Sequence, residues 1–179
     1  DFGIVVDPDV DRLAFITEKG EMFGEEYTLV ACADYILSKN KGNVVSNLSS
    51  SRALRDIAKK HGVQYAASAV GEVNVVAKMK EVNAIIGGEG NGGIIFPELH
   101  YGRDALVGVA LFLSLLTDKN ITVSALRKSY PAYYMSKNKI ELSAGLNPDK
   151  VLAAVKERYA HEPITTIDGV KIDFANSWV

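Results

Sequence analysis

Strand-like and helix-like segments alternate along most of this chain, and this order constrains the fold more than any other feature. Apolar residues recur at helical spacing over residues 26–39, whereas "NVVSNL" (43–48) and "VQYAASAV" (63–70) are short and strand-like. Further helices are expected over residues 51–61, 72–82 and 104–116. Such alternation is typical of α/β proteins, so the sequence predicts a three-layer α/β/α domain with a mixed, largely parallel sheet.

The order of elements changes after about residue 120. A helix is expected over residues 121–131, followed by a strand within "AYYMSKNKIEL" (132–142), a helix over 148–159 and a hairpin at 168–169. This pattern indicates the start of a separate α+β domain. The strand-like character of both chain ends indicates a piece of a longer protein.

Composition narrows the classes of function. The chain has 179 residues, of which 47% are hydrophobic and 23% charged, as is ordinary for a globular protein. The net charge of −2 predicts no nucleic-acid or membrane partner. The single cysteine excludes an intrachain disulfide framework and favours a reducing, cytoplasmic location.

Three aspartates, Asp7, Asp9 and Asp11, stand at alternate positions in "IVVDPDVDRLAF" (4–15). In an extended segment their side chains would point to the same side. Like charges a few ångströms apart repel by about 4 kcal/mol per pair at an effective dielectric of 20, so a positive centre or raised pKa values must compensate. Three carboxylates with open coordination positions favour Mg²⁺, and the neighbouring Arg12 would suit a phosphate oxygen.

Other interpretations of this acidic loop stay open from the residues alone. It could be a solvated surface turn, or part of a module that binds cations or sugars without catalysis. A calcium-binding EF-hand would need glycine at the position of Arg12 and helices on either side. A magnesium-dependent aspartyl phosphatase of the haloacid-dehalogenase type would use Asp7 as its nucleophile, and it would also need a lysine and an acidic pair on the same sheet.

A second unusual segment is "GGEGNGG" (87–93), which has five glycines in seven residues. It matches the G-x-G-x-x-G pattern, but that pattern must open a helix, and the "IIFP" that follows is strand-like. A flexible hairpin is the simplest interpretation. However, so many glycines cost backbone entropy, and Glu89 and Asn91 offer acceptors and donors for vicinal hydroxyls. The segment therefore predicts a sugar-binding loop.

In this order and spacing, "DPDVDR", "VGEVN" followed by "KMKEV", "GGEGNGGIIFPE" and "GRDA" resemble the α-D-phosphohexomutase superfamily over essentially the whole chain. Its members include phosphoglucomutases, phosphomannomutases and phosphoglucosamine mutases. The resemblance implies that residues 1–18 end the family's second domain and carry its metal loop. It further implies a third domain with a sugar loop over 19–120, a linker helix over 121–135 and a truncated fourth domain over 136–179.

The resemblance also implies a reaction and a set of site residues. The reaction would interconvert hexose 1-phosphate and hexose 6-phosphate through a bisphosphate, with Asp7, Asp9 and Asp11 holding Mg²⁺ beside a phosphoserine and Arg12 as a catalytic residue. The substrate-binding residues implied are Gly71, Glu72, Gly88, Glu89 and Asn91.

Two departures from the family pattern limit these expectations. The family's serine–histidine loop and its arginine-rich phosphate loop do not occur here, so this chain is expected to be inactive without the N- and C-terminal domains of its own full-length protein. Glu72 stands where some members have histidine, which leaves the general acid and base unassigned; an exposed residue in the first turn of a helix is its simplest interpretation. His61, before the helix-ending Gly62, is expected at the surface, and Asp104 is expected to cap a helix.

Overall fold

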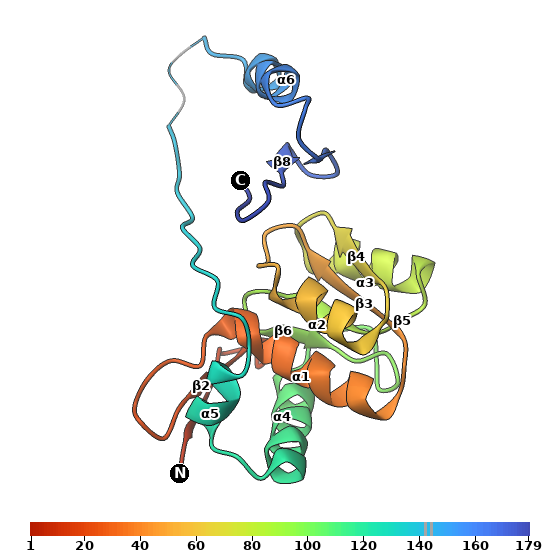
Figure 1. The fold of residues 1–179 in the computed structure, drawn as a ribbon, viewed down its shortest axis with the longest axis vertical. Coiled ribbons are helices and arrows are strands. Elements are labelled where there is room, and N and C mark those ends of the chain that lie inside the picture. Colours follow the sequence, from red (N-terminus) through yellow and green to blue (C-terminus); the bar gives the residue numbers. More distant parts are fainter. Residues whose placement is uncertain (142, 144) are drawn as a thin grey trace. The chain divides into compact units, whose positions relative to one another are not determined.

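The computed structural model describes residues 1–141, 143 and 145–179, which form two compact units, Asp1–Tyr133 and Tyr134–Val179 (Figure 1). Within this described part of the chain, no helix combines the length and the apolar character needed to cross a membrane.

A four-stranded sheet forms the centre of the first unit. Its strands, in spatial order, are β4 (Tyr65–Ser68), β3 (Asn43–Asn47), β5 (Ala84–Glu89) and β6 (Gly93–Ile95). β3 pairs in parallel with both β4 and β5, whereas β6 runs antiparallel to β5. The sheet is therefore mixed and mostly parallel, as the sequence predicts.

Helices cover both faces of this sheet and complete three layers (Figure 1). Those in the first unit are α1 (Glu25–Lys39), α2 (Ala53–His61), α3 (Glu72–Glu81) and α4 (Ala105–Lys119). Val44 belongs to the large apolar core formed with α1, α2 and α4, whereas the next residue, Val45, packs against Val75 and Met79 of α3. Successive residues of a strand point to opposite faces, so each face of the sheet has its own core.

A separate hairpin, β1 (Gly3–Val6) and β2 (Leu13–Ile16), packs into the same unit. The Phe15 ring of β2 stacks on Phe112 of α4, with ring centroids 3.7 Å apart. Val6 pairs with Leu13, so the chain reverses direction between these residues. The acidic segment is therefore the turn between these two strands, and the condition of a fully extended segment does not hold.

α5 (Val123–Lys128) also belongs to the first unit, since Val123 and Leu126 are buried in the large core. The helix expected over residues 121–131 is thus confirmed in a shorter form. The domain boundaries implied by the resemblance, at residues 18, 120 and 135, stay a prediction.

The second unit contains α6 (Pro148–Arg158) and an antiparallel pair, β7 (Ile164–Thr165) and β8 (Lys171–Ile172). The strand expected over residues 132–142 is wrong for the described residues 132–141, which carry no strand. Tyr134 and Ile140 are 96% and 81% exposed, so the segment has no packed apolar face that would stabilise a strand. Leu142, the last residue of that predicted strand, lies outside the described residues.

Candidate functional site

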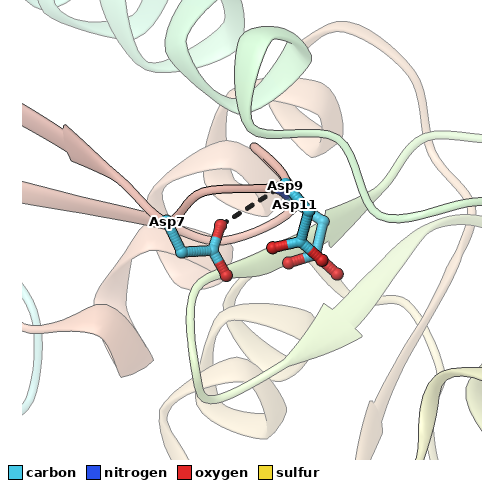
Figure 2. Close-up of side chains that lie close together, drawn as sticks. All are labelled: Asp7, Asp9 and Asp11. Atoms are coloured by element: carbon cyan, nitrogen blue, oxygen red, sulfur yellow. Dashed lines mark hydrogen bonds between the residues drawn. The ribbon is translucent and has the colours of Figure 1, made fainter.

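The acidic loop is the turn of the β1–β2 hairpin, and its carboxylates gather because of the turn. The Oδ1 atom of Asp7 accepts the backbone N–H groups of Asp11 at 3.2 Å and Arg12 at 3.0 Å, which closes the loop. Carboxylate oxygens of Asp7, Asp9 and Asp11 lie within 4.8 Å of one another, and Figure 2 shows the Asp7 carboxylate facing the other two. The three predicted metal ligands are therefore close enough to share one cation.

Val10, within this loop, has a backbone conformation that is unfavourable for its side chain. Its φ angle is +56°, in the left-handed region that β-branched residues rarely adopt. The Val10 carbonyl accepts the N–H of Ala105 at 3.1 Å, at the first residue of α4. The surrounding structure thus holds a strained loop in place, which is common at functional sites.

The carboxylates of the loop have unequal environments. For Asp7, desolvation acts to raise the pKa, but backbone hydrogen bonds from Arg12 and Asp11 hold it below its usual range. For Asp11, desolvation and the nearby charges of Asp9 and Asp7 raise the pKa although Arg103 opposes them. The raised pKa of Asp11 therefore follows from its partial burial and from the neighbouring carboxylates.

One oxygen of this loop is suited to contact a cation. The Oδ1 atom of Asp11 is buried, and no hydrogen-bond partner for it occurs among the residues that the structure describes. A buried carboxylate oxygen without a hydrogen-bond donor is costly, whereas a divalent cation would satisfy it. Three monodentate carboxylates are a donor set suited to a hard cation such as Mg²⁺, so the residues present fit that ion.

Arg12 lies at the rim of the loop. Its Nε atom is 3.7 Å from Asp7 Oδ2 and 3.8 Å from Asp11 Oδ1, and its side chain is 51% exposed. A pocket of about 270 Å³ beside the loop is lined by Asp7, Arg12 and Asn91, together with residues of β1, β2 and α1. The structure therefore brings part of the predicted metal loop and part of the predicted sugar loop to one depression.

The predicted sugar-binding segment, residues 87–93, is called the glycine loop below. It includes the connection from β5 to β6, and it lies against the β1–β2 hairpin and not open to solvent. A Cβ atom on Gly92 would lie 2.3 Å from the carbonyl oxygen of Leu13, and one on Gly93 would lie 2.5 Å from Cδ of Arg103. The many glycines predict a loop backbone that is open to a ligand, and this prediction is wrong at Gly92 and Gly93. The glycines allow other parts of the chain to approach closely.

Glu89 is correspondingly buried, with 4% of its surface exposed. Its Oε1 atom accepts hydrogen bonds from Asn47 Nδ2 at 2.7 Å and from the backbone N–H of Gly71 at 3.3 Å. Its Oε2 atom accepts from Arg103 at 2.8 Å. A role for Glu89 in holding sugar hydroxyls stays a prediction, and it would need lone pairs that these contacts leave available.

The other predicted substrate-binding residues surround Glu89. Asn91 is half-buried and accepts the N–H of Gly93 through Oδ1 at 3.2 Å, while Gly88 pairs with Ile94 across the β5–β6 ladder. Glu72 opens α3, and its Oε1 atom accepts the backbone N–H of Arg103 at 3.0 Å. Its interpretation as a simple exposed residue is therefore wrong, since its side chain is only 35% exposed and is paired.

Arg103 is a residue of this cluster that sequence reasoning missed. It lies between β6 and α4, its side chain is 15% exposed, and it forms ion pairs with Asp11, Glu72 and Glu89. It occurs in "GRDA", a motif that the sequence links to a family but to no specific contact. The pairing of this partly buried arginine with several carboxylates depends on residues far apart in sequence, so no local signal indicates it.

The alternatives for the acidic loop differ in their fit to this geometry. Strands, not helices, flank the loop, so an EF-hand does not fit. The aspartyl phosphatase interpretation requires an acidic pair on the nucleophile's own sheet. Here β1 pairs with β2 in a two-stranded sheet that is separate from the mixed four-stranded sheet, so the fold gives the aspartyl phosphatase interpretation no support.

Comparison with known proteins places this geometry in a family context. The family profile described as "Phosphoglucomutase/phosphomannomutase, alpha/beta/alpha domain III" matches residues 24–134. A "Phosphoglucomutase/phosphomannomutase" of Thermococcus kodakarensis is 35% identical over 182 residues, and a "Probable phosphoglucosamine mutase" of Methanopyrus kandleri is 31% identical over 181 residues. Each alignment covers 100% of this chain and 40% of the relative, so the chain spans about two fifths of the length of these curated relatives.

Solved structures share the fold. The crystal structure of a "Phosphoglucomutase/phosphomannomutase family protein" from Burkholderia thailandensis superposes with a TM-score of 0.83 at 24% identity, covering 99% of this chain and 38% of that one. A "putative phosphomannomutase" from Thermus thermophilus gives a TM-score of 0.74 at 22% identity, covering 99% of this chain and 39% of that one.

Proposed function

The chain belongs to the phosphoglucomutase/phosphomannomutase family, and from this membership we propose that it supplies the metal loop and the sugar loop of a magnesium-dependent phosphohexomutase. The full-length protein would interconvert hexose 1-phosphate and hexose 6-phosphate through a bisphosphate intermediate. The observation that carries this proposal is the convergence of Asp7, Asp9 and Asp11 within 4.8 Å, with a buried oxygen of Asp11 lacking a hydrogen-bond partner in the described part of the chain.

In the proposed reaction the residues of this chain position the reacting groups and balance charge. Asp7, Asp9 and Asp11 would hold Mg²⁺, which, when bound, supplies positive charge near the phosphoryl oxygens. Phosphoryl transfer depends mostly on positioning and charge stabilisation, so this arrangement suits the reaction. The half-exposed guanidinium of Arg12 offers paired donors to a further phosphoryl oxygen.

The glycine loop would bind the sugar. Asn91 lines the pocket beside the metal loop, and its side-chain amide can donate to a hydroxyl while Oδ1 accepts from Gly93. Glu89 lies at the end of β5, at the carboxyl edge of the sheet where α/β proteins commonly bind ligands. The names of the relatives point to glucose, mannose or glucosamine phosphates as the substrate class.

Because the chain covers only part of its relatives, the test requires the full-length protein in which it occurs. With Mg²⁺ and a hexose bisphosphate activator, we expect conversion of a glucose, mannose or glucosamine phosphate, loss of that conversion with a chelator, and recovery on adding Mg²⁺ back. The isolated 179-residue chain should be inactive, since the phosphoryl donor loop is absent from its sequence.

Two results would contradict the proposal. One is the absence of isomerisation with all three sugars by a folded full-length protein. The other is metal-dependent release of inorganic phosphate by the isolated chain, which would favour the aspartyl phosphatase alternative with Asp7 as nucleophile.

A further inference from the structure

Arg103 is partly buried and lies among carboxylates from three separate parts of the chain. Its NH2 group pairs with Oδ2 of Asp11 in the metal loop, and its NH1 group donates to Oε2 of Glu89 in the glycine loop at 2.8 Å. Its Nε atom lies 3.3 Å from Oε2 of Glu72 at the start of α3. One guanidinium therefore contacts all three carboxylates.

These contacts determine which oxygens remain for ligands. Arg103 engages Oδ2 of Asp11, so that the other oxygen, Oδ1, is buried without a hydrogen-bond partner in the part of the chain that the structure describes. In Glu89, Arg103 engages Oε2 while Asn47 and Gly71 engage Oε1. The same side chain thus contacts one oxygen of a predicted metal ligand and one oxygen of the predicted sugar-binding carboxylate.

The path of the Arg103 side chain depends on Gly93. A Cβ atom at Gly93 would lie 2.5 Å from Cδ of Arg103 and 3.2 Å from its Cγ, so any larger residue would displace the arginine. The planar guanidinium presents several donors in a fixed geometry, whereas a lysine ammonium is a single point of charge. Only arginine can bridge Asp11 and Glu89 from this position while also reaching Glu72.

We propose that Arg103 is a positioning residue that couples the metal loop to the glycine loop. It holds Asp11 with one oxygen directed to the cation. It also fixes the position of Glu89, and of the loop that follows Glu89, relative to Asp11. The expected effects on kcat/KM rest on the proposed function. The expected effects on loop exchange and Mg²⁺ affinity do not require that the protein isomerise a sugar phosphate.

The test compares Arg103→Gln and Arg103→Lys with wild type. The matched control is Arg127→Gln, because Arg127 is also an arginine of the first unit and stacks on Tyr27, with its guanidinium carbon 3.4 Å from the ring centroid. The first readout is hydrogen–deuterium exchange in residues 89–93 without metal. We expect exchange there to rise on the order of 10-fold in Arg103→Gln, because a charge-assisted hydrogen bond to the loop is lost, and to stay unchanged in Arg127→Gln.

The second readout is a titration of the full-length protein with Mg²⁺ alone. We expect the dissociation constant to rise on the order of 10-fold in Arg103→Gln. Arg103→Lys keeps the charge but not the bridging geometry. It should therefore recover less than half of the Mg²⁺ affinity that Arg103→Gln loses, measured on a logarithmic scale. Full restoration by lysine would show that only the charge matters and would overturn the positioning role.

The third readout is kcat/KM for the hexose phosphate in a double-mutant cycle with Glu89→Gln. If Arg103 acts through Glu89, the loss in the double variant will be clearly smaller than the product of the two single losses. A multiplicative loss, or unchanged loop exchange and Mg²⁺ affinity in Arg103→Gln, would contradict the coupling. Absence of isomerisation by the wild type would contradict the proposed function, while loop exchange and Mg²⁺ titration would still decide the role of Arg103.

Discussion

Leu13 donates its backbone N–H to the carbonyl oxygen of Gly92 at 3.1 Å, which joins the hairpin that carries the metal loop to the predicted sugar loop. The contact requires glycine for two reasons. Gly92 has a φ angle of +89°, and a Cβ atom there would lie 2.3 Å from the carbonyl oxygen of Leu13. The acidic loop and the glycine loop are thus joined by a backbone hydrogen bond as well as by the ion pairs of Arg103.

Gly92→Ala should therefore destabilise the protein by about 2–3 kcal/mol, since it combines backbone strain with a steric clash. Gly20→Ala is the matched control: Gly20 has a similar φ angle of +77°, but nothing lies within 4 Å of the Cβ position. That variant should lose only about 1–2 kcal/mol. Free energies of unfolding from urea denaturation measure both, and equal losses would show that the approach of Leu13 to Gly92 is unimportant.

Glu89→Gln tests the glycine loop. In the full-length enzyme kcat/KM should fall roughly 10- to 100-fold, because hydrogen bonds to a charged group are worth about 1.5–3 kcal/mol. The sequence alone predicts little change in thermal stability, but the burial of Glu89 beside Arg103 changes that expectation. We now expect a loss of about 1–3 kcal/mol as well.

The kinetic and thermodynamic effects of Glu89→Gln can be separated. Measuring kcat/KM well below the melting midpoint of the variant removes the contribution of unfolded protein. Wild-type kcat/KM under those conditions would mean that Glu89 serves only the fold.

Asp34 makes the stability of the first unit sensitive to acid. Its side chain is 2% exposed and accepts hydrogen bonds from His61, Lys60, Lys119 and Tyr130. Desolvation acts to raise its pKa, but the hydrogen bonds from His61 and Lys119 outweigh this and lower the pKa from 3.8 to about 2. A depressed carboxyl pKa contributes stability above pH 4, and this contribution is lost as the pH falls from about 4 to 2.

The expected size of the effect follows from the shift. Wild type should lose about 2 kcal/mol more of its free energy of unfolding than Asp34→Asn between pH 5 and pH 2, because the variant has no carboxyl to protonate there. Asp118→Asn, at a surface pair with Lys39, should keep the wild-type pH dependence. Parallel curves for wild type and Asp34→Asn, from urea denaturation at each pH, would contradict this explanation.

Local signals in the sequence predict most of the first unit. The helix expected over residues 72–82 is observed as Glu72–Glu81, because its apolar spacing and preceding glycine are local features. Asp104 caps α4 as expected, since its side chain accepts the N–H of Val107 at 3.0 Å. α2 ends at His61, and the φ angle of +68° at the following residue, Gly62, explains the glycine there.

Features that depend on distant residues could not be predicted in this way. His61, expected at the surface, is half-buried with Nε2 2.7 Å from Asp34 Oδ1, a partner 27 positions earlier in the chain. Arg103 likewise depends on Asp11, Glu72 and Glu89. Such ion pairs leave no pattern in a single sequence because each half is an ordinary charged residue.

The most direct measurement is the Mg²⁺ dependence of isomerisation by the full-length protein and its Asp9→Asn variant. Asp9 is exposed and contributes a carboxylate to the aspartate cluster, so its replacement should leave the fold intact and remove charge from the cation site. We predict that kcat falls by roughly 100-fold or more and that the Mg²⁺ concentration for half-maximal rate rises. Asp149→Asn, in the first turn of α6, should behave as wild type. An unchanged Mg²⁺ profile for Asp9→Asn would show that the three aspartates form an ordinary surface turn and not a metal site.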